Sequence, residues 1–88
     1  MYYVYIIVNE EGKTYIGYTS DLENRLEAHN SGKNSSTKNH KWKYVYYEAF
    51  KSQEDARERE RRLKNHGQSK RQLKARIIRS IQATVENI

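Results

Sequence analysis

The hydrophobic positions of the sequence are densest near its start. The run YYVYIIV over 2–8 is β-branched or aromatic at every position, which predicts a strand that is covered on both faces. A polar turn over 9–12 ends in Gly12, and a second strand-like run follows over 13–18. Because glycine supplies the positive φ that a tight turn needs, the two runs predict a β-hairpin.

The pattern then changes to one that favours a helix. Ser20 followed by Glu23 is a capping-box pair, and it predicts a helix that continues to about Asn30 and stops at Gly32. The next stretch, SGKNSSTKNHKWK over 31–43, is small, polar and basic, with no hydrophobic period. It is too long for a tight turn, so we expect either a solvated connector or a surface that contacts a ligand.

One face of this helix combines hydrophobic and ionisable residues. On a helical period Leu22, Leu26 and His29 share a side, and Arg25 lies at its margin. Arginine is rarely buried without a partner. The helix therefore either pairs Arg25 internally, for example with Asp21, or presents it to a cleft.

The second half of the chain predicts one more strand and two helices. The run YVYYEAF over 44–50 has the length and aromatic content of a strand. Ser52 with Asp55 repeats the capping pattern and predicts a helix to about Asn65, and a last helix is expected from Ser69. The order β-β-α-β-α-α predicts an α+β fold, a small three-stranded antiparallel sheet with flanking helices.

A single carboxylate lies on the hydrophobic side of the second predicted helix. Ala56 and Leu63 are the apolar residues of that helix, and Glu60 lies between them on the same side. A buried carboxylate is costly unless it has a cationic partner or a metal ion. Glu60 is therefore either a metal ligand or the partner of a cation such as Arg25 or Arg57.

The length and the cysteine count limit the class of protein. A chain of 88 residues can close one small core, so we expect one domain over 1–84 and a frayed tail over 85–88. Cysteine is absent, which excludes disulfides and thiolate metal sites. No stretch has the pattern of a signal peptide or a membrane span, so we expect a soluble, cytoplasmic protein.

The charge balance favours a polyanionic partner. Lysine and arginine number 17 against 11 acidic residues, a net charge of +6, although small domains are also basic for solubility alone. Nothing in the sequence indicates an obligate protein partner. The candidate contacts to a nucleic-acid backbone, which equally suit a solvated face, are Lys33, Lys38, Lys41, Lys64, Lys70 and Arg71.

Several of these features occur together in a known order. Val4-Tyr5-Ile6 in the first strand is followed by Tyr15-Ile16-Gly17 in the second, then by Arg25 and His29 on one helix and Glu60 on the next. This order resembles the catalytic domain of GIY-YIG nucleases over nearly the whole chain. The similarity is greatest to short stand-alone bacterial members that consist of little more than that domain.

The resemblance implies an activity and a role for each matching residue. It implies a metal-dependent endonuclease that hydrolyses phosphodiester bonds, in DNA more than in RNA, in repair or in the processing of mobile elements. Tyr5 and Tyr15 match the two signature tyrosines, and Arg25 and His29 match the helix positions of the family. Glu60 matches the glutamate that binds the metal, Mg²⁺ or Mn²⁺.

Chemistry supports these types of residue and leaves alternatives open. A guanidinium can contact two phosphoryl oxygens at once, and one carboxylate with water and phosphate is the ordinary way to hold magnesium near a nucleic acid. The resemblance implies that Tyr15 is the general base, and His29 is the alternative because imidazole titrates near neutral pH. Without the family, Tyr5 and Tyr15 would be core tyrosines and His29 a hydrogen-bonded, half-buried histidine.

The sequence also departs from the family pattern. Val4 replaces the first glycine of the family name, a position without a functional side chain. Many members carry an asparagine after the glutamate helix, and no asparagine occurs between Gly67 and Glu86. The alternative function is therefore a catalytically weak nucleic-acid-binding module that keeps the nuclease fold.

Overall fold

The hairpin and the third strand form one antiparallel sheet. In the computed structural model, which describes residues 1–88, β1 (Tyr2–Asn9) lies between β2 (Thr14–Thr19) and β3 (Trp42–Phe50). Both neighbours pair with β1 in antiparallel register. The central position of β1 explains why its sequence is hydrophobic on both faces, and the predicted α+β fold is confirmed.

The turn between β1 and β2 closes as its residues predict. Gly12 has φ +82°, the left-handed conformation that favours glycine. The buried side-chain oxygen of Asn9 accepts hydrogen bonds from the backbone amides of Glu11 and Lys13, at 2.9 and 3.1 Å. These bonds fix the end of the hairpin from inside.

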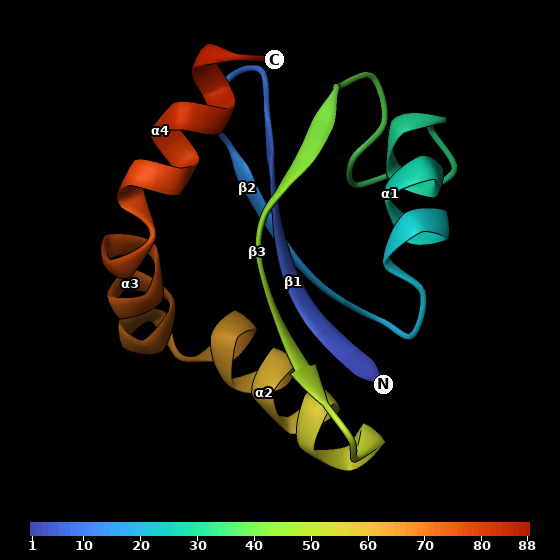
Figure 1. The fold of residues 1–88 in the computed structure, drawn as a ribbon, viewed down its shortest axis with the longest axis vertical. Coiled ribbons are helices and arrows are strands. Elements are labelled where there is room, and N and C mark those ends of the chain that lie inside the picture. Colours follow the sequence, from blue (N-terminus) through green and yellow to red (C-terminus); the bar gives the residue numbers. More distant parts are fainter.

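Helices cover both faces of the sheet (Figure 1). The first helix packs on one face, and the other three form an arc over the opposite face. None of the helices is long and apolar enough to span a membrane. The helices are α1 (Leu22–Asn30), α2 (Gln53–Asn65), α3 (Gly67–Arg76) and α4 (Ile78–Glu86).

The alternation of side chains along β1 divides the core in two. Even-numbered positions such as Val4 and Ile6 pack with Leu63 and other residues of the helices α2 to α4. Odd-numbered positions, Tyr5 and Ile7, pack on the α1 side. The α1 side is thus the face on which a tyrosine of the central strand meets the helix that carries the predicted arginine and histidine.

A register shift in β3 brings a further tyrosine to the α1 side. Ile6 pairs with Tyr46, whereas the next residue, Ile7, pairs with Tyr44, so β3 carries one extra residue there. Tyr44 consequently packs beside Tyr5, with ring centroids 5.4 Å apart. Its hydroxyl donates a 2.6 Å hydrogen bond to the carbonyl of Leu22 and fixes the first turn of α1.

The first helix starts one residue later than the capping box predicts. Asp21, not Ser20, is the N-cap, and its carboxylate accepts from the backbone amide of Asn24 at 3.1 Å. Thr19 supports this arrangement, because its hydroxyl accepts from the Asp21 amide. Aspartate caps a helix as well as serine does, so the aspartate directly after Ser20 takes the N-cap position in its place.

The second predicted helix is confirmed, whereas the last one is divided. Ser52 caps α2, as expected, and accepts from the Asp55 amide at 3.3 Å. The last helix begins at Gly67 and breaks at Ile77, whose φ of −109° and ψ of 19° leave the helical region. The boundary at 84 stays a prediction; α4 itself continues to Glu86.

Candidate active site

Tyr5 lies at the centre of the candidate site and leaves no room for a side chain opposite it. The residue is fully buried in β1, and its partner in β2 is Gly17. A Cβ atom at Gly17 would overlap the hydroxyl and the ring of Tyr5. Glycine at position 17 therefore lets the phenol lie flat across β2 and point toward α1.

The Tyr5 hydroxyl joins two residues of α1. It lies 2.7 Å from Nε2 of His29 and accepts a 3.2 Å hydrogen bond from Nε of Arg25. Residues 25 and 29 are one helical turn apart, so both side chains reach the same oxygen. The other nitrogens of Arg25 form no hydrogen bond within the chain, and the alternative pairing with Asp21 does not occur.

A residue that the sequence did not indicate holds the other side of the imidazole. Nδ1 of His29 lies 2.8 Å from Oγ1 of Thr37, and both residues are buried. Thr37 lies in the loop between α1 and β3, and its carbonyl accepts a 2.7 Å hydrogen bond from the indole of Trp42. A threonine in a polar loop has no periodicity that would have marked it as buried.

The environment keeps His29 and Tyr5 neutral. Burial, with the nearby positive charge of Arg25, lowers the pKa of His29 below its usual value. Burial raises the pKa of the Tyr5 phenol, and the hydrogen bond from Arg25 only partly opposes this. Near neutral pH a protonated phenol therefore faces a neutral imidazole.

Tyr15 packs on this group and keeps a free hydroxyl. Its ring lies edge-on to His29, with centroids 5.2 Å apart, and it is half-buried. The Tyr15 hydroxyl forms no hydrogen bond within the chain and is not enclosed. The phenol of Tyr15 can therefore reach a ligand, whereas that of Tyr5 cannot.

Glu60 approaches from α2, which packs along β1 and β2. Its carboxylate forms a 3.0 Å ion pair with Nζ of Lys64, one helical turn away. The same ammonium group lies 5.5 Å from the centroid of the Tyr15 ring. Lys64, predicted as a contact to nucleic acid, thus lies between Glu60 and Tyr15. Arg57, a possible partner of Glu60, stacks on the ring of Tyr18 instead.

The donor set around Glu60 suits a hard cation. One carboxylate oxygen faces Lys64, and the other has no hydrogen-bond partner in the chain. Magnesium is commonly held near nucleic acids by one or two carboxylates, with water and phosphate as the other ligands. Glu60 can hold such an ion if it shares its carboxylate with Lys64 or displaces it.

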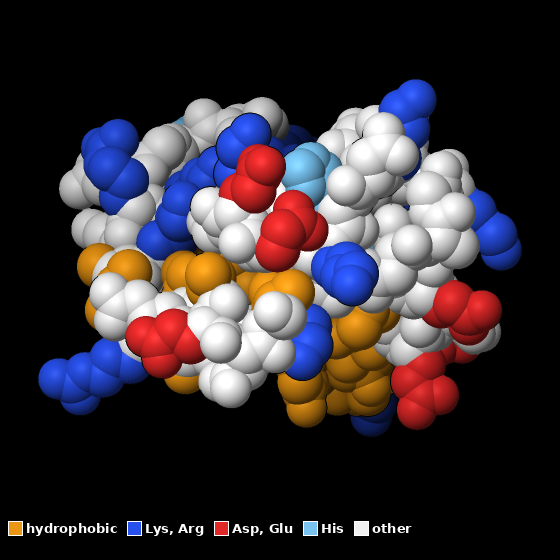
Figure 2. All heavy atoms as spheres, turned by 90° about the horizontal axis from the view of Figure 1, so that it is seen from above, with side chains coloured by type: hydrophobic (Ala, Val, Ile, Leu, Met, Phe, Trp, Pro, Cys, Tyr) orange, Lys and Arg blue, Asp and Glu red, His pale blue; other side chains and the backbone are white.

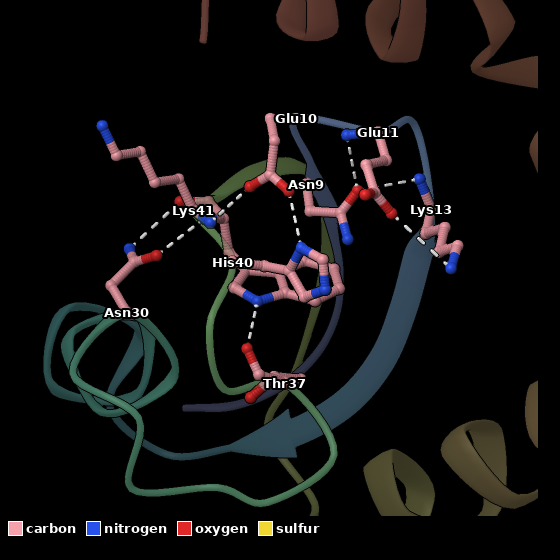
Figure 3. A network of polar contacts seen from close by, with 9 residues as sticks. Asn9, Glu10, Glu11, Lys13, Asn30, Thr37, His40 and Lys41 are labelled. Atoms are coloured by element: carbon pink, nitrogen blue, oxygen red, sulfur yellow. Dashed lines mark hydrogen bonds and ion pairs between the residues drawn. The ribbon is translucent and has the colours of Figure 1, made fainter.

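A second group of possible metal ligands lies at the hairpin turn. Glu10, Glu11 and His40 bring ligand atoms within 4.8 Å of one another. Figure 2 shows acidic side chains beside a histidine on this end of the molecule. Both oxygens of Glu10 are engaged, at 2.5 Å by His40 and at 2.6 Å by the amide of Lys41 (Figure 3). These contacts therefore connect the hairpin turn to the loop that follows α1. We call the contacts of Glu10 with His40 and with the Lys41 amide the Glu10 clasp.

The predicted nucleic-acid contacts lie on two surfaces. Lys33, Lys38 and Lys41 are exposed on the loop that follows α1. Lys70 and Arg71 lie on α3, which covers the opposite face of the sheet (Figure 1). The structure does not bring these residues together into one patch.

Comparison with known proteins identifies the family. The family model described as "GIY-YIG catalytic domain" matches residues 1–74, a range that includes Tyr5, Tyr15 and Glu60. The chain belongs to the GIY-YIG family. GIY-YIG domains are nuclease domains and generally use divalent metal ions, so the substrate is a nucleic acid.

Proteins of similar length align with most of the chain. A UPF0213 protein of Bacillus pumilus is 36% identical over 74 residues, which cover 82% of this chain and 76% of the relative. A UPF0213 protein of Streptococcus agalactiae is 35% identical over 79 residues, covering 88% and 86%. One from Haloquadratum walsbyi is 32% identical over 73 residues, covering 81% and 82%. No solved structure matches the chain significantly.

Proposed function

We propose that this GIY-YIG domain is an endonuclease that hydrolyses phosphodiester bonds in DNA with Mg²⁺ or Mn²⁺. The observation that carries the proposal is the arrangement of Arg25. Its Nε lies 3.2 Å from the buried Tyr5 hydroxyl, and its remaining nitrogens form no hydrogen bond within the chain. The Tyr15 phenol is close enough to act electrostatically on this guanidinium. A guanidinium held in this way is positioned to receive a phosphoryl group.

Arg25 would stabilise the charge that spreads over the phosphoryl oxygens. Its free N–H groups can donate to two oxygens in parallel. The hydrogen bond to Tyr5 would hold the half-buried guanidinium in place before substrate binds, which lowers the cost of reorganisation during reaction. The pKa of Arg25 is raised, chiefly by its hydrogen bond to Tyr5, so the group stays charged.

Tyr15 would accept the proton of the attacking water. Of the two candidates for the base, His29 is the weaker, because its Nε2 is occupied by the Tyr5 hydroxyl at 2.7 Å. His29 is also only 1% exposed, so a water molecule has no path to its ring. Tyr5 and His29 then act by orienting Arg25 and Tyr15.

Glu60 would hold the divalent metal ion through its free carboxylate oxygen. When bound, the ion supplies positive charge for the phosphoryl oxygens and lowers the energy of the leaving oxygen. Lys64 lies where it can move between Glu60 and a substrate phosphate, since its flexible stem already spans Glu60 and Tyr15. The loop residues Lys33, Lys38 and Lys41 would contact the backbone of the DNA beyond the cleaved bond.

A cleavage screen with matched variants tests this function. Duplex, branched and single-stranded DNA, and the corresponding RNAs, are incubated with Mg²⁺ or Mn²⁺. We expect wild-type protein to cut at least one DNA and Glu60→Gln and Arg25→Ala to reduce the rate at least about a hundredfold. Glu58→Gln is the control, because Glu58 lies on the same helix but pairs with Arg62. Full activity of Glu60→Gln would refute the assignment.

A nucleic-acid-binding module is the second candidate. Two observations favour it: Lys64 already neutralises Glu60, and no asparagine follows the glutamate helix before Glu86. Salt-sensitive DNA binding without cleavage of any substrate, under either metal ion, would establish this function in place of the nuclease.

A further inference from the structure

The loop between α1 and β3 contains one residue that is fully buried. Thr37 has 0% of its surface exposed, although the residues on either side of it are exposed. Its backbone amide donates to the carbonyl of Asn34 at 3.1 Å. Its own carbonyl accepts from the indole of Trp42 at 2.7 Å, a bond drawn at Thr37 in Figure 3. Thr37 is therefore held on both sides, with its hydroxyl directed at His29.

The hydrogen bonds around His29 can run in only one direction that satisfies every group. Nε of Arg25 can only donate, so the oxygen of Tyr5 accepts from it. The proton of Tyr5 is then donated to Nε2 of a neutral His29. The proton of the imidazole must lie on Nδ1, which donates to Oγ1 of Thr37. The Thr37 hydroxyl in turn donates to the carbonyl of Asn34 at 3.4 Å.

We propose that Thr37 is a positioning residue that fixes the tautomer of His29 and, through Tyr5, the orientation of Arg25. This inference rests on the proposed nuclease function for its effect on rate, but the tautomer itself does not depend on that function. If Oγ1 is removed, the Nδ1 proton loses its buried acceptor, which favours the tautomer with its proton on Nε2. A proton on Nε2 would face the Tyr5 hydroxyl, which must then turn its own proton away from His29.

The predicted consequence is a loss of rate rather than of substrate binding. Arg25 and Tyr15 keep their positions near the substrate, but the hydroxyl that anchors Nε of Arg25 is no longer held. Loss of a hydrogen bond to the far side of a metal-bound histidine typically reduces activity about 10- to 100-fold, and we expect an effect of similar size at His29. We expect the fall in kcat, with KM changed less than about threefold.

Three variants and two measurements test the proposal. Thr37→Val has nearly the same shape without the acceptor, Thr37→Ser keeps it, and Thr84→Val is the control because it removes a threonine hydroxyl on α4. Proton–nitrogen NMR spectra of the imidazole report the tautomer, and single-turnover cleavage reports the rate. We expect a proton on Nδ1 of His29 in the wild type, Thr37→Ser and Thr84→Val, and a shift toward Nε2 in Thr37→Val.

The outcomes separate this proposal from the proposed function. A wild-type His29 with its proton on Nε2, or a Thr37→Val variant with unchanged tautomer and unchanged kcat, would overturn the role of Thr37. If Thr37→Val folds poorly, the tautomer of His29 is measured in Thr37→Ala instead. The tautomer in the wild type tests the proposal in either case. If no substrate is cleaved but the tautomer follows Thr37 as expected, the nuclease proposal fails while the hydrogen-bond assignment stands.

Discussion

Gly17 is the position at which a single atom decides whether the site can form. A methyl group there would overlap the ring and hydroxyl of Tyr5, which α1 holds in place through His29. We predict that Gly17→Ala destabilises the protein by about 1–3 kcal/mol, as overpacking of a core usually does. Chemical denaturation measures the change, with Gly67→Ala as the control because a Cβ there meets only the end of the Arg71 side chain. Equal stability of the two variants would contradict the prediction.

His29 gives the stability of the protein a dependence on pH near neutrality. Burial lowers its pKa in the folded state below the value of about 6.5 in the unfolded chain. Protonation therefore favours unfolding, so the stabilising contribution is complete above about pH 6.5 and is lost as pH falls toward the folded pKa. The pKa values of the Glu10 and Glu48 carboxyls are lowered from the usual 4.5. Their contribution to stability is therefore lost at a more acidic pH than that of His29, as pH falls below about 4.5.

We predict that the free energy of unfolding falls as pH decreases from about 7.5 to about 5.5. His29→Gln should have a smaller slope over this range, because it removes the titrating group while keeping an oxygen acceptor near the Tyr5 hydroxyl. Urea denaturation at a series of pH values measures both slopes. The same slope in the variant and the wild type would assign the effect to another group.

Given the proposed function, Lys64 would compete with a metal ion for the carboxylate of Glu60. The ion pair is partly exposed, with 43% and 22% of the two side chains accessible, so its strength is limited to about 1 kcal/mol. Given the proposed function, Lys64→Met should lower the dissociation constant for Mn²⁺ about two- to fivefold. Isothermal titration without DNA measures this directly. Tighter binding accompanied by a lower cleavage rate would show that Lys64 also contacts substrate, whereas weaker binding would contradict competition.

The elements of the fold follow from sequence where one interaction dominates. The length and β-branched content of 2–8 were enough to predict β1, and its two covered faces, because a central strand has no solvent side. The break between α3 and α4 was missed, since Leu73, Ile77 and Ile81 continue one helical period without interruption. All three residues are buried in the structure. The break therefore follows from packing this row of apolar residues against the sheet, and no local sequence signal marks it.

The candidate site was predictable only in part, because some of its residues are positioned by contacts between distant segments. The order of Tyr5, Arg25 and His29 along the chain matches the family pattern, and the structure brings these residues onto one hydroxyl. Thr37 and the register shift that positions Tyr44 depend on contacts between distant segments. Neither leaves a periodic or compositional trace in the sequence.

The loop over 31–41 is held by the Glu10 clasp, whose strength depends on pH. Hydrogen bonds from His40 and from the Lys41 amide lower the pKa of the Glu10 carboxyl. The clasp is therefore present above the usual carboxyl range and is lost as pH falls through the lowered pKa. We predict that Glu10→Gln increases amide hydrogen exchange across 31–41, with little effect on β1. Glu11→Gln is the control, because Glu11 pairs only with the exposed Lys13. Unchanged exchange in Glu10→Gln would show that Thr37 and Trp42 hold the loop alone.

At the scale of the whole molecule, the basic side chains lie on two surfaces separated by the sheet. The sheet separates the loop that carries Lys33 and Lys38 from α3, which carries Lys70 and Arg71 (Figure 1). Arg25 and Tyr15 lie on the α1 side with the loop. If the protein binds DNA as proposed, we expect a straight duplex whose phosphate reaches Arg25 to contact the loop more than α3.

This asymmetry predicts different salt dependences for the two surfaces. Each phosphate contact to duplex DNA contributes about −0.9 to the slope of log K against the logarithm of salt concentration. We expect Lys33→Gln with Lys38→Gln to reduce the magnitude of the slope by about 1–2. Each lysine that no longer neutralises a phosphate leaves about one counterion bound to the DNA. Lys70→Gln with Arg71→Gln, an equal loss of charge, should leave the slope within about 0.5 of the wild type. Fluorescence anisotropy in the presence of Ca²⁺, over a series of salt concentrations, gives both slopes without cleavage. A larger effect of the α3 pair would mean that DNA wraps around the sheet or binds first on the face opposite Arg25.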